Sequence, residues 1–196
     1  VDYPGFNLNI AKYVKSNLQI PVHYYISPKV WAWKEYRVKK LKAFVEEIFT
    51  ILPFETEYFR KHGINVNYLG NPLVDPVTAF KNNAQPGNEF RADNKLDDRP
   101  LVVLLAGSRN QEVRNSLPVM VKAAEGYDQF QFVVVGVLTV DRKIYESILK
   151  GSGIPVIYGR TYDLLNNSSA ALVTSGTASL EAALFDVPQA VMYRLE

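Results

Sequence analysis

The segment Gly107-Ser108-Arg109 has the residue types that a phosphate group requires. It follows the apolar run 101–105 and precedes a helical pattern over about 111–125. Glycine lets the backbone approach a ligand closely, Ser108 can donate a hydrogen bond, and Arg109 can bind phosphate through two parallel bonds. The helix N-terminus would add oriented N–H donors. Gly-Ser before a helix is also an ordinary turn and cap, so the segment alone is weak evidence.

A second segment of this kind follows the apolar run 170–173. It contains Ser175, Gly176, Thr177 and, one helical turn later, Glu181. Residues four apart share a helix face, and a carboxylate there could accept hydrogen bonds from a vicinal diol such as a ribose. The alternative is a hydroxyl cap with a solvated glutamate. Two such segments at one edge of a parallel sheet favour a nucleotide.

The amino-terminal part offers a carboxylate and a basic, aromatic segment. Asp2, followed by Tyr3-Pro4-Gly5, is either a turn residue or a general base that faces a cleft. The stretch 27–33, SPKVWAW, leads into a lysine- and arginine-rich helix predicted over 30–46. That helix is either a solvated face with two core tryptophans or a surface for an anionic, partly apolar ligand or a membrane.

The elements that must position these residues alternate between strand and helix. From Arg99 onward, apolar strands are predicted at 101–105, 130–135, 154–158, 170–173 and 189–192, with helical patterns between them. Continuously apolar strands indicate burial on both faces, and the alternation indicates a parallel sheet. The fold class is therefore α/β, with residues 1–74 as a partial α/β domain, 75–98 as a polar linker and 99–196 as an incomplete nucleotide-binding domain.

The composition excludes several function classes. A net charge of +2 over 196 residues gives no reason to expect nucleic acid as a partner, and the absence of cysteine removes disulfides and thiolate metal sites. His23 and His62 lack metal-ligand spacing, so no metal site is expected. Neither GxGxxG nor GxxxxGK[ST] occurs, and no apolar run approaches the roughly 18–20 residues that span a bilayer.

Several motifs together resemble the bacterial lipid-A-disaccharide synthase family. They occur along nearly the whole chain in the order VDYPGFN, SPKVWAWK, LPFE, GNPLVD, GSRNQEV and SGTASLE. The resemblance implies a GT-B fold, with two Rossmann-like domains. It implies an inverting glycosyltransferase of lipid A biosynthesis that moves 2,3-diacylglucosamine from its UDP derivative to 2,3-diacylglucosamine 1-phosphate. The products would be UDP and the lipid A disaccharide 1-phosphate.

The resemblance also assigns roles to residues and implies partners. Asp2 matches the family's proposed base, Arg109 an arginine needed for activity, and Ser175, Gly176, Thr177 and Glu181 the donor-nucleotide segment; Gly107 and Ser108 belong to the arginine's motif. No cofactor or metal is implied. The implied location is cytoplasmic, peripheral on the inner membrane, and a homodimer is compatible with it.

This sequence departs from the family pattern at two of these motifs. Asn71 stands where the family often has His, and Ala106 where it often has Pro. Other family segments lie outside these residues, so the chain is expected to be an internal piece that does not catalyse transfer alone. Two alternatives remain open, namely a UDP-sugar 2-epimerase of GT-B architecture and a non-catalytic nucleotide-binding module.

Overall fold

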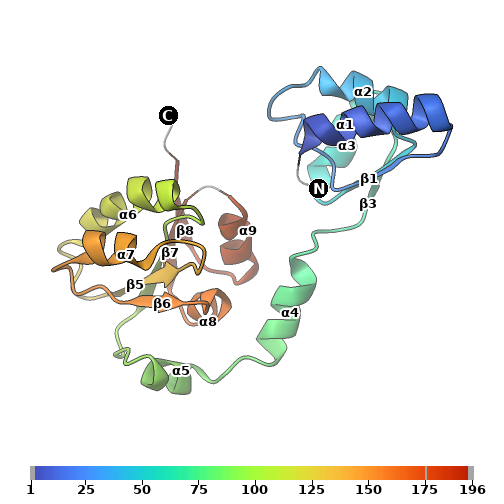
Figure 1. The fold of residues 1–196 in the computed structure, drawn as a ribbon. Helices are drawn as coiled ribbons and strands as arrows, with labels where there is room; N and C mark the ends of the chain where they lie inside the picture. The colour runs from blue at the N-terminus through green and yellow to red at the C-terminus, as the bar shows by residue number, and fades with distance from the viewer. Residues whose placement is uncertain (1–2, 175, 194–196) are drawn as a thin grey trace. The chain divides into compact units, whose positions relative to one another are not determined.

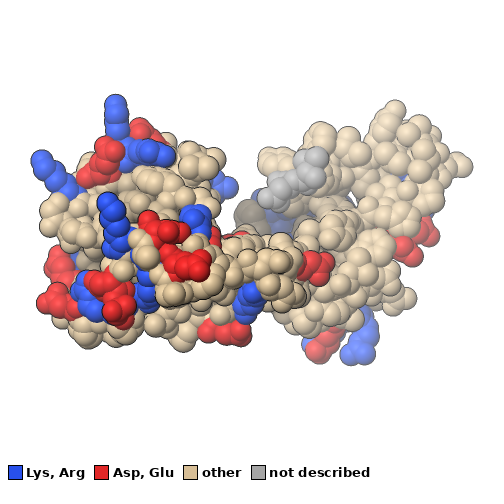
Figure 2. All heavy atoms as spheres, turned by 90° about the horizontal axis from the view of Figure 1, so that it is seen from below, with Lys and Arg blue, Asp and Glu red and all other residues tan. Residues whose placement is uncertain are grey.

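A computed structural model describes residues 3–174 and 176–193 of the chain. The chain divides into two compact units, Val1–Val74 and Asp75–Glu196, which are described separately (Figure 1). Within the described residues, the longest apolar helix is too short to cross a membrane. Basic and acidic side chains are interspersed over the larger unit, on the left of Figure 2, as the small net charge leads one to expect.

The first unit is a three-stranded parallel sheet with helices, in the order β1-β2-β3. Its elements are α1 (Pro4–Tyr13), the π-helix η1 (Val14–Leu18), β1 (His23–Tyr25), α2 (Arg37–Phe44), β2 (Glu47–Thr50), α3 (Pro53–Lys61) and β3 (Val66–Tyr68). Leu8 of α1, Leu41 of α2 and Phe59 of α3 meet Ile48 of β2 in one apolar core. The Asn7 amide donates to the Tyr24 hydroxyl over 3.2 Å, which ties α1 to β1.

The second unit is a five-stranded parallel sheet in the order β6-β5-β4-β7-β8. Its strands are β4 (Leu101–Leu105), β5 (Gln131–Gly136), β6 (Val156–Tyr158), β7 (Ala170–Thr174) and β8 (Gln189–Met192). Its helices are α4 (Val74–Asn82), α5 (Gly87–Asp93), α6 (Asn110–Ala124), α7 (Arg142–Leu149), α8 (Thr161–Asn166) and α9 (Thr177–Leu184). The α/β fold class with parallel sheets is confirmed.

Both faces of this sheet are covered, which explains the continuous apolar strands. Residues of α6 and α7 pack on one face with Leu104 of β4, and residues of α4, α5, α8 and α9 pack on the other with Val103. All five residues of β4 are buried. Successive strand side chains point to opposite faces, so burial on both faces requires an apolar residue at every position.

Two predictions about local structure are wrong. The segment 75–98, expected as a linker, contains α5 and most of α4, and it buries Val77 and Phe90 in the core of the second unit. The helix expected over 30–46 is confined to α2, because turns precede it and Lys34 has a positive φ of 59°. A non-glycine residue in that region interrupts a helix.

Candidate functional site

A cavity of about 390 Å³ lies at the carboxyl edge of the second sheet. Strands β4, β5 and β7 end there, and α9 begins there. The cavity is lined by Leu105, Gly107, Ser108, Val135, Val137, Thr161, Thr174, Gly176, Thr177, Ala178 and Glu181. The two segments singled out in the sequence therefore meet in one cavity, at the edge where open α/β sheets bind ligands. Ser175 and Asp2 lie outside the described residues.

Glu112, in the first turn of α6, organises the loop that carries Gly107 and Ser108. Its Oε2 accepts hydrogen bonds from the backbone N–H of Ser108 at 2.8 Å and of Arg109 at 3.2 Å. Its Oε1 accepts one from the Arg109 guanidinium at 2.6 Å. A carboxylate from within the chain thus accepts hydrogen bonds from two N–H groups, those of Ser108 and Arg109, that the sequence offered to a ligand anion.

The tight fit of this carboxylate explains the glycine at position 107. Gly107 has a φ of +118°, and a Cβ added there would lie 2.5 Å from the Cβ of Glu112. Any side chain would therefore collide with Glu112 as well as strain the backbone. Burial raises the pKa of Glu112, but hydrogen bonds from Ser108 and Arg109 outweigh it and lower this pKa below its ordinary value.

Arg109 does not line the cavity in this structure. Its side chain is 79% exposed and extends from the loop, with one guanidinium nitrogen on Glu112. The guanidinium has five N–H donors in a planar fork, so further donors remain for an anion. The sequence indicated Arg109 as a phosphate ligand but did not reveal Glu112, because the residue three positions before it is an arginine and not the Ser or Thr of a capping box.

Glu181 of α9 lines the cavity together with Thr177, one turn before it. Its Oε1 accepts a hydrogen bond from the Tyr162 hydroxyl of α8 at 3.2 Å. Burial raises the pKa of Glu181, and the bond from Tyr162 lowers it by less. A half-buried carboxylate with free acceptor capacity suits a neutral donor such as a sugar hydroxyl better than an anion.

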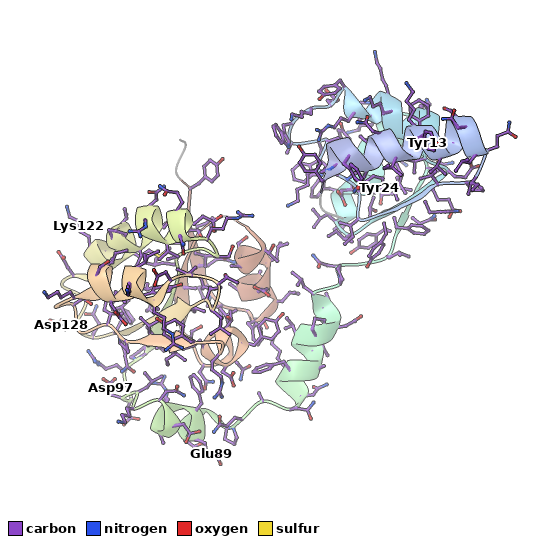
Figure 3. The ribbon with its side chains drawn as sticks, viewed as in Figure 1. Tyr13, Tyr24, Glu89, Asp97, Lys122 and Asp128 are labelled. Atoms are coloured by element: carbon purple, nitrogen blue, oxygen red, sulfur yellow. The ribbon has the colours of Figure 1, made fainter. Side chains whose placement is uncertain are left out.

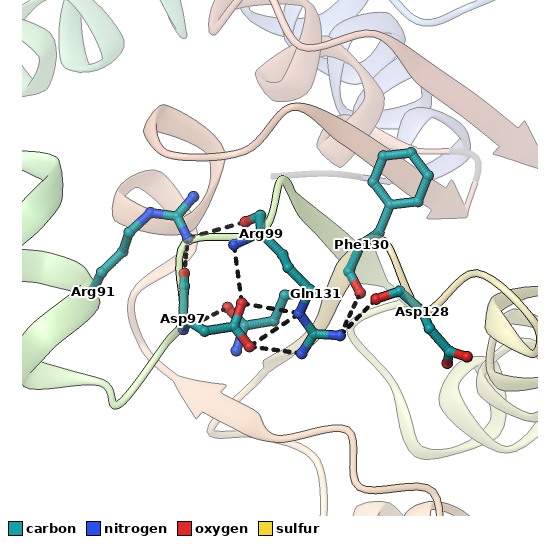
Figure 4. Close-up of polar contacts among 6 residues, drawn as sticks. All are labelled: Arg91, Asp97, Arg99, Asp128, Phe130 and Gln131. Carbon is teal, nitrogen blue, oxygen red and sulfur yellow. Dashed lines mark hydrogen bonds and ion pairs between the residues drawn. The ribbon is translucent and has the colours of Figure 1, made fainter.

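The opposite edge of the sheet carries a second cavity, of about 400 Å³, lined in part by Arg99. The guanidinium of Arg99 is held by the Asp97 carboxylate and by the carbonyls of Asp128 and Phe130 (Figure 4). Asp97 also accepts from the Arg99 backbone N–H, and its own N–H donates to Gln131. Figure 3 shows Asp97 and Asp128 on this side of the unit. These contacts join the chain before β4 to the start of β5, which is a structural role.

In the first unit, Glu55 of α3 is a buried carboxylate that fixes the loop before α2. Its side chain accepts hydrogen bonds from the Ser27 hydroxyl at 2.9 Å and the Trp31 indole at 3.2 Å. It also accepts from the backbone N–H groups of Ile51 and Leu52. Four donors compensate the burial of one charge, so the SPKVWAW and LPFE motifs form one hydrogen-bonded unit.

The two tryptophans are not core residues. Trp33 is 64% exposed, with the Lys34 ammonium 4.1 Å from its ring centroid, and Trp31 is 37% exposed. The interpretation of two core tryptophans is therefore wrong. Exposed aromatic rings beside lysines suit a surface that meets an apolar, anionic ligand.

Comparison with protein families shows to which family the chain belongs. A family model described as lipid-A-disaccharide synthetase matches residues 1–196. The chain belongs to the lipid-A-disaccharide synthetase family. The lipid-A-disaccharide synthase of Myxococcus xanthus is 40% identical over the whole chain, and that of Syntrophus aciditrophicus is likewise 40% identical. Lipid-A-disaccharide synthase 1 of Legionella pneumophila is 33% identical over 99% of the chain.

The family relatives are longer than this chain. The chain spans about half of each of them, 51% of the Myxococcus protein and 52% of the Syntrophus protein. Among solved structures, the S. aureus MnaA–UDP co-structure matches with a TM-score of 0.61 and 16% identity, covering 91% of this chain and 53% of that one. UDP-GlcNAc 2-epimerase from Neisseria meningitidis bound to UDP-GlcNAc matches with a TM-score of 0.57 and 17% identity, covering 91% and 54%. At these identities the likeness shows the fold alone, and it confirms the expected GT-B type.

Proposed function

We propose that this chain contributes to an inverting glycosyltransferase that transfers 2,3-diacylglucosamine from UDP-2,3-diacylglucosamine to 2,3-diacylglucosamine 1-phosphate. Membership of the lipid-A-disaccharide synthetase family supports this activity. The observation that carries it is the single cavity formed by the Gly107 loop and the start of α9 with Glu181. The cavity combines hydroxyl and carboxylate groups and lies beside Arg109, as a nucleoside diphosphate would need.

In this proposal the second unit binds the donor nucleotide. Arg109, Ser175, Gly176 and Thr177 would bind the diphosphate, and Glu181 would accept hydrogen bonds from the ribose. Charge that develops on a departing diphosphate is stabilised by cations and N–H donors fixed in advance. Glu112 would keep the Gly107 loop in shape while leaving the other guanidinium donors of Arg109 for the phosphates.

Asp2 would act as the base in this reaction. It would take the proton of the acceptor 6-hydroxyl as that oxygen forms a bond to C1 of the donor sugar. The bond between C1 and the diphosphate oxygen breaks, and UDP leaves with the electron pair. Attack opposite the leaving group inverts C1 and gives the β-1,6 linkage.

We also propose that the full-length protein works at the cytoplasmic face of the inner membrane, as a peripheral protein. The substrates carry acyl chains, and the first unit exposes apolar side chains on α1, including Phe6, Ile10 and Tyr13, which are 52%, 47% and 58% exposed. Spacings of four and three residues place these side chains along one helix face. A homodimer is compatible with such a surface, and mass measurement in detergent would detect it.

UDP release by a full-length protein that contains this chain tests the proposed activity. Release should require both the UDP-linked donor and the diacylated glucosamine 1-phosphate acceptor. Donor turnover without acceptor would instead indicate the epimerase, and tight UDP binding without turnover would indicate a binding module. Family membership favours the transferase over both alternatives.

A further inference from the structure

Two adjoining cavities in the first unit share Tyr3, Gly5 and Arg37. One has a volume of about 400 Å³ and reaches Lys40, and the other, of about 390 Å³, reaches Lys29 and Lys34. Arg37, in the first turn of α2, lines both cavities and is partly buried. A Cβ placed on Gly5 would lie 3.7 Å from Arg37 Nη2, so the guanidinium lies against the start of α1.

The charge around these cavities is of one sign. Their lining includes four cationic side chains and no carboxylate among the described residues. Glu35 lies between Lys34 and Arg37 in the sequence, but its carboxylate has other partners. Its Oε1 lies 3.3 Å from Nε2 of His62 and accepts a hydrogen bond from the Tyr58 hydroxyl at 3.5 Å. Within residues 3–174 and 176–193, the four cations take part in none of the ion pairs. Such a cluster favours an anion, and the planar fork of Arg37 matches a phosphate.

Aromatic side chains surround the same cations. Tyr3, Phe6, Trp33 and Tyr36 line one or both cavities, and all four are more than half exposed. Exposed rings beside a phosphate-binding cluster suit a ligand that is anionic at one point and apolar elsewhere. Inorganic phosphate has no apolar part, whereas the acyl chains of a phosphorylated glycolipid supply one.

We propose that Arg37, assisted by Lys29, Lys34 and Lys40, binds the 1-phosphate of the acceptor glycolipid. This assignment rests on the proposed function and extends it, because it gives the acceptor a binding site of its own. Asp2, the proposed base, directly precedes Tyr3 in the sequence, and consecutive Cα atoms are only about 3.8 Å apart. The proposed base is therefore next in the chain to a residue that lines both cavities.

Steady-state kinetics of a full-length protein with two acceptors tests this site. Diacylglucosamine 1-phosphate and its dephosphorylated form are compared in detergent. Arg37→Ala should raise the KM for the phosphorylated acceptor by about ten- to a hundredfold, the usual effect of losing a charge-assisted hydrogen bond. The KM for the dephosphorylated acceptor and for the UDP-linked donor should change by less than about twofold. Arg37→Lys, which keeps the charge but not the fork, should give an intermediate value.

Lys39→Ala is the matched control, because Lys39 lies on the same helix but lines neither cavity. It removes one positive charge and should leave both KM values unchanged. An equal rise in KM for both acceptors in Arg37→Ala would overturn the proposal. So would unchanged KM values together with weaker binding of Arg37→Ala and Lys39→Ala to phosphatidylglycerol vesicles, since the cations would then serve a membrane surface.

Calorimetry with glucosamine 1-phosphate separates this inference from the proposed function. If the wild-type protein transferred nothing but bound glucosamine 1-phosphate in preference to glucosamine, and Arg37→Ala lost that preference, the phosphate site would stand without the activity. Transfer without any such preference would retain the activity and refute the site.

Discussion

Glu112 accounts for the residue types of the loop before α6. Its carboxylate takes the N–H groups of Ser108 and Arg109 and one nitrogen of the Arg109 guanidinium. Only glycine leaves room for it at position 107. The Gly107-Ser108-Arg109 segment therefore binds the carboxylate of Glu112. A ligand anion can bind only the donors that Glu112 leaves free, such as the remaining N–H groups of the Arg109 guanidinium.

Glu112→Gln should lower the free energy of unfolding of the second unit by about 0.5–2 kcal/mol at neutral pH, the usual contribution of a cap. Hydrogen bonds hold the pKa of Glu112 below its ordinary value of 4.5, so its contribution to stability is present above 4.5 and is lost as pH falls through the folded-state pKa. The difference between wild type and variant in urea unfolding should shrink below about pH 4.5. A difference that grew with acidity would contradict this.

Arg109→Ala should weaken UDP binding by about ten- to a hundredfold and leave thermal stability nearly unchanged, because its ion pair with Glu112 is exposed. Calorimetric titration with UDP measures the affinity. Arg114→Ala, an exposed arginine of the same helix outside the cavity lining, is the control. Equal affinities in the two variants would leave Arg109 with a purely structural role.

Glu181→Gln should reduce the preference for UDP over 2′-deoxy-UDP, because the proposed partner of Glu181 is a ribose hydroxyl. Burial raises the pKa of Glu181, so any stability it contributes is present at low pH and lost as pH rises through the folded-state pKa. The variant should therefore not be less stable at neutral pH.

The UDP affinity of wild type should fall relative to this variant as pH falls through the raised pKa, since protonation removes the negative charge and turns one of the two acceptor oxygens into a donor. Because both proteins bind the same ligand, the comparison cancels protonation of the diphosphate. A constant ratio of affinities between neutral pH and about 4.5 would contradict the ribose assignment.

At the scale of elements, α3 fixes the loop before α2 through Glu55. Glu55→Ala should lower the free energy of unfolding of the first unit by several kcal/mol, because four donors lose their acceptor and two of them come from the loop. Trp31 loses its hydrogen bond, so its fluorescence should shift to the red. Glu57→Ala removes an exposed ion pair with Lys61 on the same helix. It should change neither the free energy of unfolding nor the tryptophan fluorescence. An unshifted spectrum in Glu55→Ala would show that the loop holds without it.

The sequence predicted the strands of the second unit well, because burial on both faces leaves an unbroken apolar run such as 101–105. It failed for α5, where Pro86 and Gly87 look like a turn and Phe90 alone anchors the helix in the core. It also failed for residues 30–36, where the Glu55 bond to Trp31 overrides a helical pattern. The place of the nucleotide cavity was predictable from the strand ends. The role of Glu112 and the position of Arg37 between two cavities depend on contacts that residue order does not show.

At the scale of the whole molecule, each unit has its own core, and both tryptophans lie in the first. Phe90→Ala should destabilise the second unit by about 3–5 kcal/mol because it removes a fully buried ring. The lower stability of the second unit should appear as an earlier unfolding transition in far-ultraviolet circular dichroism. The unfolding transition seen by tryptophan fluorescence should stay where it is in wild type. Val119→Ala, which shortens an exposed side chain of α6 in the same unit, should leave both transitions unchanged. A shifted fluorescence transition in Phe90→Ala would mean that the two units unfold together.

The central position of β4 in its sheet has a consequence for synthesis on the ribosome. Val102 of β4 pairs with Phe132 of β5 and with Ala170 of β7, so one side of this strand has no neighbour until β7 has been made. The strands β1, β2 and β3 of the first unit are all made long before that point. Until β7 is made, a growing chain therefore carries an apolar strand with one open edge, the kind of intermediate that invites aggregation. Slow translation between β5 and β7 should prolong that exposure, so the yield of folded protein should depend on codon choice in this stretch more than in the stretch before β4.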